Sequence, residues 1–149
     1  NVASVAGKMD NRVIAAYQQL GFKLVVDPSV NYSGYFDARS RSITMKQIDD
    51  SVYHELGHFL AFIAGNADKT ASFQSIFATE KANVTAFNKA YVTQNASEYF
   101  AESVKDYILN NASLKSTRPQ TYAAVQNALN QITDAQIAKI QKIYGAFWN

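Results

Sequence analysis

Apolar positions near the start of the chain recur at helical spacing and then change to a strand pattern. Residues 8–20 carry apolar side chains on one helical face and stop at Gly21, which predicts a helix with a glycine end. These side chains are Val13, Ile14, Tyr17 and Leu20. Residues 22–26 form a short run rich in β-branched side chains, ended by Asp27 and Pro28, which predicts a strand.

The pattern changes once more before position 50. Tyr35 and Phe36, a polar turn over residues 37–40, and then Ile43 and Met45 predict a β-hairpin. After position 49 the apolar spacing is helical throughout, with predicted helices over residues 49–64, 70–81, 96–110, 119–131 and 134–144. The fold class predicted is therefore a mainly helical α+β domain with one small sheet from its N-terminal third.

Length and charge narrow the classes of protein to consider. A chain of 149 residues without cysteine suits a single domain over residues 1–149, held together by its core rather than by disulfides. The net charge is only +2 and no block of Lys or Arg occurs, which argues against a nucleic-acid partner. The longest apolar run, residues 59–65, is far shorter than the roughly 20 residues of a membrane span. Residues 1–7 lack the features of a secretory signal.

The candidate chemistry lies in the segment that contains both histidines of the chain. His54 and His58 are four positions apart, so that on a helix both imidazoles project from nearly the same side and can bind one metal ion. Glu55 lies about 100° further round the helix, where it can accept a proton from a water molecule without binding the metal. This is the HExxH arrangement of zinc peptidases. The competing interpretation is a core helix that happens to contain two histidines.

A third zinc ligand has to be a carboxylate, because a catalytic zinc usually takes three protein ligands and no further histidine or cysteine exists. The other glutamates are Glu80, Glu98 and Glu102. Glu98 and Glu102 are four positions apart on a predicted helix, so that one could bind the metal while the other orients a histidine. Either could reach the ion, and the alternative is that both belong to a solvated helix face.

These segments resemble a known family. Residues 98–103, the motif at His54 to His58 and residues 119–122 are similar to the catalytic domain family of anthrax lethal factor, which includes the bacterial Pro-Pro endopeptidases. The resemblance extends over roughly residues 10–131 and includes residues 73–77. It implies a zincin-like fold, a Zn2+ cofactor, a peptide or protein substrate and secretion from a bacterium. It also implies roles for single residues: His54, His58 and Glu98 as zinc ligands, Glu55 as general base, Glu102 behind the metal, and Tyr91 as the donor to the oxyanion.

The chain differs from the Pro-Pro endopeptidases before each of the two metal-binding segments. Pro-Pro endopeptidases carry a longer stretch with a tryptophan before the metal helix and a charged residue before the ligand glutamate. Here no tryptophan precedes Trp148, and Ser97 stands before Glu98.

We expect a zinc-dependent endopeptidase of the gluzincin type. The alternatives are a zinc-binding docking domain without catalysis and a structural helical domain; the presence of Glu55 favours the enzyme. We also expect an extended peptide substrate to pair with an exposed strand edge around Ile43 to Met45.

Overall fold

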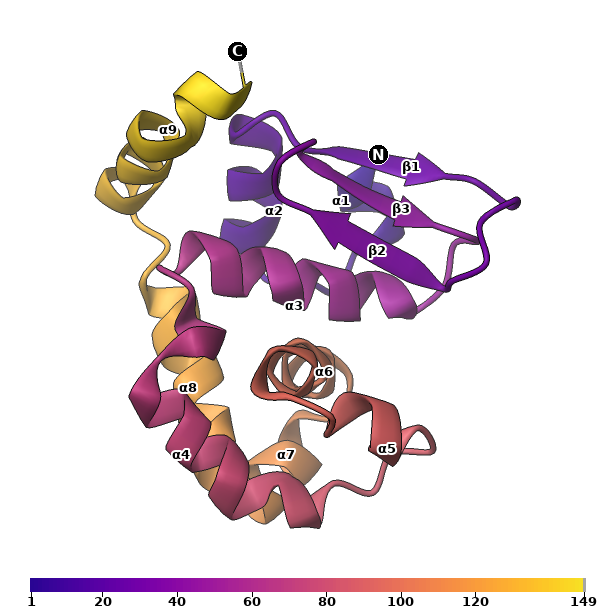
Figure 1. The fold of residues 1–149 in the computed structure, drawn as a ribbon, viewed down its shortest axis with the longest axis vertical. Coiled ribbons are helices and arrows are strands. Elements are labelled where there is room, and N and C mark those ends of the chain that lie inside the picture. Colours follow the sequence, from indigo (N-terminus) through magenta and orange to yellow (C-terminus); the bar gives the residue numbers. More distant parts are fainter. Residues whose placement is uncertain (149) are drawn as a thin grey trace.

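The strand and the hairpin near the N-terminus join into one sheet, and helices make up the rest of the molecule (Figure 1). This computed structural model describes residues 1–148. The strands are β1 (Lys23–Val26), β2 (Gly34–Asp37) and β3 (Ser42–Met45). The α-helices are α1 (Val2–Val5), α2 (Asn11–Gln19), α3 (Ser51–Ile63), α4 (Ala71–Glu80), α5 (Lys89–Val92), α6 (Ala96–Leu109), α7 (Asn111–Thr117), α8 (Pro119–Asn130) and α9 (Asp134–Trp148). Two short 3-10 helices, η1 (Ala67–Lys69) and η2 (Lys81–Asn83), flank α4. The predicted α+β class is confirmed.

The sheet has the order β1-β3-β2, with β1 parallel to β3 and β2 antiparallel to it. The predicted hairpin is therefore correct, but the prediction that residues 43–45 form an exposed edge is wrong. The chain passes from β1 to β2 before it returns as β3, so β3 lies between the other two strands. Ile43 and Met45 are fully buried as a result. The edge next to α3 belongs to β2.

Helix α3 lies against the sheet on one side and against α6 on the other (Figure 1). Its apolar residues Val52, Leu56, Phe59, Leu60 and Ile63 are buried in the core. The backbones of α3 and α6 come together at Gly57. A Cβ atom at this position would lie 2.6 Å from the carbonyl oxygen of Ala101 and 2.8 Å from its Cα atom. Only glycine allows this approach, so the absence of a side chain at position 57 sets the spacing between the two helices.

A buried carboxylate links α6 to the helices on its far side. Glu80, at the end of α4, accepts hydrogen bonds from the backbone N–H groups of Gln120 at 3.0 Å and Thr121 at 2.8 Å. Helix α8 has no cap from its own preceding residue, and Glu80 supplies one from another helix. The hydroxyl of Thr121 lies 2.6 Å from that of Tyr99 on α6. This network anchors the helix that carries Glu98 and Glu102.

The differences from the predicted elements lie at helix ends and in short helices. Helix α2 begins at Asn11 rather than at residue 8, because the Asp10 side chain caps it by accepting a hydrogen bond from the N–H of Arg12. Helix α9 continues to Trp148, whose indole N–H donates to the carbonyl of Ala38. Helices α1, α5 and α7 were not predicted. Within residues 1–148, no helix combines the length and the apolar character needed to cross a membrane.

Candidate metal centre

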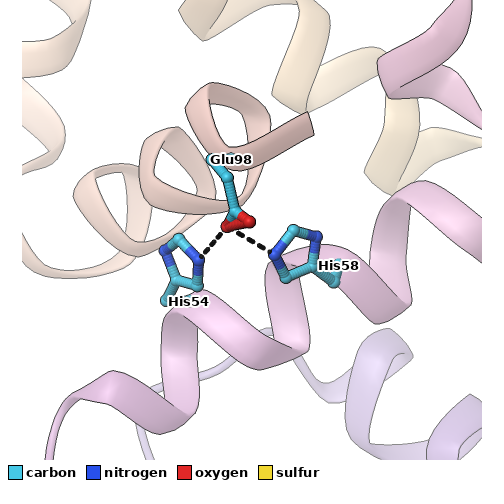
Figure 2. Close-up of side chains that lie close together, drawn as sticks. All are labelled: His54, His58 and Glu98. Atoms are coloured by element: carbon cyan, nitrogen blue, oxygen red, sulfur yellow. Dashed lines mark hydrogen bonds and ion pairs between the residues drawn. The ribbon is translucent and has the colours of Figure 1, made fainter. Parts of the chain in front are cut away.

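His54 and His58 extend from consecutive turns of α3 toward α6, where Glu98 faces them (Figure 2). The apolar side of α3 is in the core, which leaves the two histidines on the side that faces α6. Glu98 lies in the first turn of α6, where the Asn95 side chain caps the helix by accepting from the Glu98 N–H at 2.8 Å. The Asn95 cap therefore fixes the start of α6 and, with it, the position of Glu98 in the first turn.

The three side chains converge on one point. A single oxygen of Glu98, Oε1, lies 2.9 Å from Nε2 of His54 and 3.0 Å from Nε2 of His58. One ligand atom from each residue falls within 4.8 Å of the other two. Ligand atoms around a tetrahedral zinc ion lie about 3.3 Å apart, given bond lengths of about 2.0–2.2 Å. Two imidazole nitrogens and a carboxylate oxygen at these separations thus fit zinc in both chemistry and spacing.

Glu102 lies one turn after Glu98 and contacts the opposite side of the His54 ring. Nδ1 of His54 lies 2.8 Å from Oε1 of Glu102, and because a carboxylate only accepts, Nδ1 carries a proton and donates it. This bond orients the ring so that Nε2 points to Glu98. Behind Glu102, Arg118 is buried and donates a hydrogen bond to Ser103 at 3.1 Å. The structure therefore places Glu98 against both histidines and Glu102 against the far nitrogen of one.

Glu80, the remaining candidate for the third ligand, lies elsewhere. Its carboxylate accepts hydrogen bonds from Gln120 and Thr121 at the start of α8.

Glu55 lies beside the histidines and under the edge strand. Its side chain is buried against Gly34, the first residue of β2, where a Cβ atom would lie 2.8 Å from Cγ of Glu55. Burial raises the pKa of Glu55, and the positive charge of His54 opposes this rise. A buried carboxylate in this place can accept a proton from a water molecule at the metal position.

Tyr91, on the short helix α5, lies close to His54 although the two residues are distant in the sequence. Its ring centre lies 6.3 Å from that of His54, and 53% of the residue remains exposed. Partial burial and the nearby carboxylates of Glu98 and Glu55 raise the pKa of the Tyr91 hydroxyl. The hydroxyl is therefore protonated at neutral pH and able to donate a hydrogen bond.

Cavities open on both sides of the histidines. One is lined by His54, Glu55 and Tyr91 together with Tyr32, Gly34 and Lys105. The other is lined by His58 and Phe36 together with Ala61, Asp68, Lys69 and Ser97. Strand β2 contributes Gly34 to the first cavity and Phe36 to the second, so that the cleft follows the edge of the sheet past the three converging side chains.

The cleft contains residues that the sequence pattern did not single out for a role. Ser97, noted only for its place before Glu98, donates a hydrogen bond to the buried Asp68 at 2.7 Å. Gly34 and Lys105 contact the site from outside the motifs, and no regular spacing in the sequence connects them with His54.

Without a metal ion, proton binding to His54 should stabilise the fold. Burial lowers the pKa of His54, but hydrogen bonds to Glu102 and Glu98 outweigh this effect and raise the pKa to about 9. A folded-state pKa above the ordinary 6.5 gives a stabilisation that is complete below pH 6.5 and is lost as the pH rises through 9. We expect the free energy of unfolding of chelator-treated protein to fall by roughly 3 kcal/mol between pH 6.5 and 9.5.

Urea unfolding at the two pH values measures this change. His54→Gln is the matched control, because it removes the titrating group and should flatten the dependence. Zinc competes with the proton on Nε2, so zinc affinity should rise over the same range. A metal-free protein equally stable at both pH values would contradict the assigned protonation of His54.

Comparison with known proteins found a matching family and a similar peptidase. The family model of "Anthrax toxin lethal factor, N- and C-terminal domain" matches residues 10–128. A Pro-Pro endopeptidase of Clostridioides difficile (strain 630) is 41% identical over 78 residues, which are 50% of this chain and 34% of that protein. The aligned part thus spans about a third of the relative's length. The match to the family model includes α3, α6 and every residue that converges on the candidate metal position. The chain belongs to the anthrax lethal factor family.

Proposed function

We propose that the protein is a zinc-dependent endopeptidase of the gluzincin type. The observation that carries this proposal is the convergence of His54, His58 and Glu98 on one point in a cleft, with the buried carboxylate of Glu55 beside them. Family membership supports it, as does the similarity to a protein named Pro-Pro endopeptidase. The proposal takes residues 1–149 as one catalytic domain, and secretion stays a prediction.

Each residue of the site would have a separate task. His54, His58 and Glu98 would hold the ion, and Glu102 would keep the His54 ring in place through Nδ1. When bound, zinc supplies a water molecule with a pKa near 7 and polarises the substrate carbonyl.

The remaining steps belong to side chains around the metal position. Glu55 accepts the proton of the attacking water and passes it to the amine that leaves. Tyr91 donates a hydrogen bond to the carbonyl oxygen as negative charge develops there. The buried position of Glu55 beneath Gly34 holds this base close to any peptide in the cleft.

The substrate would be an extended peptide bound along β2. This strand is at the edge of the sheet next to α3, and an edge strand offers backbone N–H and C=O groups to a further strand. The similarity to the Pro-Pro endopeptidase extends over a third of that protein, and we do not propose Pro-Pro bonds as the cleavage site on that basis.

The alternative function is a zinc-binding docking domain without catalysis. Such a domain needs the three ligands but has no use for a base beside them. Glu55 is buried, although burial of a carboxylate is unfavourable unless its environment compensates for the lost hydration. This placement favours the enzyme.

Metal removal tests the proposal. We expect purified protein to contain one zinc ion per chain and to cleave peptides in an unbiased mixture. A chelator should abolish cleavage and zinc should restore it. The side chains of the cleft alone do not lower the pKa of water enough to activate it at neutral pH. Elemental analysis and mass spectrometry of the products measure the two quantities. Zinc-free native protein, or cleavage that survives chelation, would contradict the proposal.

A further inference from the structure

A lysine that the proposed mechanism does not use faces the cleft from α6. Lys105 follows Glu102 by three positions and lines the cavity that also contains His54, Glu55 and Tyr91. Its side chain is 28% exposed, so that most of it is removed from water. It is the only lysine or arginine among the described residues that line this cavity.

The ammonium group of Lys105 has no hydrogen-bond partner within residues 1–148. Its nearest carboxylate oxygen is Oε2 of Glu102, at 4.0 Å, which is beyond hydrogen-bond length. The other oxygen of Glu102 already accepts from His54. A lysine ammonium has three donors, so Lys105 retains donors that a ligand with negatively charged oxygens can use.

The cavity on the other side of the histidines has a different charge pattern. It contains Lys69, which is exposed, and Asp68, which is buried and bonded to Ser97. Because Lys69 is exposed, water and salt screen its attraction for an acidic ligand, whereas most of the Lys105 side chain is removed from water. We therefore expect the stronger preference for an acidic ligand on the Lys105 side of the cleaved bond.

We propose that Lys105 forms a subsite for a carboxylate group on the substrate, C-terminal to the cleaved bond; this rests on the proposed peptidase function. The position follows from the direction of β2, in which Gly34 lines the Lys105 cavity and Phe36, further along the strand, lines the other cavity. Antiparallel pairing is the slightly more stable arrangement, and it places the C-terminal part of a bound peptide at the Gly34 end. The carboxylate comes from an Asp or Glu side chain or from the C-terminus of the peptide.

The experiment compares cleavage preferences of four proteins loaded with zinc. These are the wild type, Lys105→Met, Lys105→Glu and Lys142→Glu. The last variant makes the same charge change as Lys105→Glu on an exposed position of α9, outside the cleft. Each protein is incubated with a peptide mixture, and cleaved sites are aligned by mass spectrometry. Each cleaved sequence is then resynthesised as two pairs of peptides. One pair differs in Glu or Gln and tests a side-chain carboxylate; the other ends in a free acid or an amide and tests a terminal carboxylate.

We expect the wild type and Lys142→Glu to favour the carboxylate member of one pair type by roughly three- to tenfold in kcat/KM. The preference should disappear in Lys105→Met and change to a preference for Lys or Arg in Lys105→Glu. Because the readout is a ratio within each variant, a general loss of rate does not affect it. The same preference in all four proteins, or an acidic preference N-terminal to the cleaved bond, would overturn this inference and leave the peptidase intact. No cleavage of any peptide by the zinc-loaded wild type would overturn both.

Discussion

Glu55→Gln is expected to lower the cleavage rate by about 10²–10⁴-fold while zinc content stays at one ion per chain. The amide of glutamine has nearly the shape of the carboxylate and fits under Gly34, but it cannot accept a proton from water. Glu55 is not among the three side chains that converge on the metal position, so its replacement leaves the ligands unchanged.

The measurement combines turnover of a cleaved peptide with elemental analysis and thermal unfolding of the same preparation. Lys142→Gln serves as a control for loss of a charge at an exposed site, and it should keep both activity and zinc. An undiminished rate in Glu55→Gln would show that another group accepts the proton. Loss of zinc together with activity would place Glu55 among the ligands.

Glu98→Ala is expected to weaken zinc binding far more than Glu102→Ala. Glu98 has one oxygen directed at both histidine Nε2 atoms, so its removal leaves two ligands for a metal that usually takes three from the protein. Glu102 contacts only Nδ1 of His54, and its loss should weaken affinity or activity by about 10- to 100-fold through poorer orientation of the ring.

Competition titrations against a chromophoric zinc chelator measure both affinities on one scale. Urea unfolding of the metal-free variants shows whether a weaker site reflects a weaker fold, since both carboxylates contact His54 in the absence of metal. If Glu98→Ala retained zinc more tightly than Glu102→Ala, the two roles would have to be exchanged.

Much of the fold follows from local patterns in the sequence. Strand β1, the hairpin of β2 and β3, and the long helices α3, α4, α6 and α8 lie where the apolar spacing predicts them. Helix α7 was not predicted because it buries only Leu114 and has no repeated apolar face. The order of the strands was also not predictable, because the pattern predicts a strand and its buried face but not its neighbours in the sheet.

In the candidate site too, short sequence patterns predict some features, whereas contacts between distant segments are not predictable from them. The spacing of His54, Glu55 and His58 on one helix is local and was readable from the sequence. The pairing of Glu98 with both histidines joins residues that are 40 or more positions apart, and the residue spacing alone left Glu98 and Glu102 equivalent. Lys105 and Gly34 carry no signal of their own, since their importance arises only from their distance to Glu102 and Glu55.

The contact at Gly57 has a consequence for how this protein could be redesigned. The distance between the two ligand-bearing helices depends on main chain packed against main chain, at Gly57 and Ala101, rather than on the bulk of any side chain in the cleft. Residues on the cleft walls, such as Tyr32 and Lys69, can therefore be exchanged in large numbers without altering the distances within the metal position. A library that varies the walls and keeps position 57 as glycine would sample new substrate preferences on an unchanged catalytic frame.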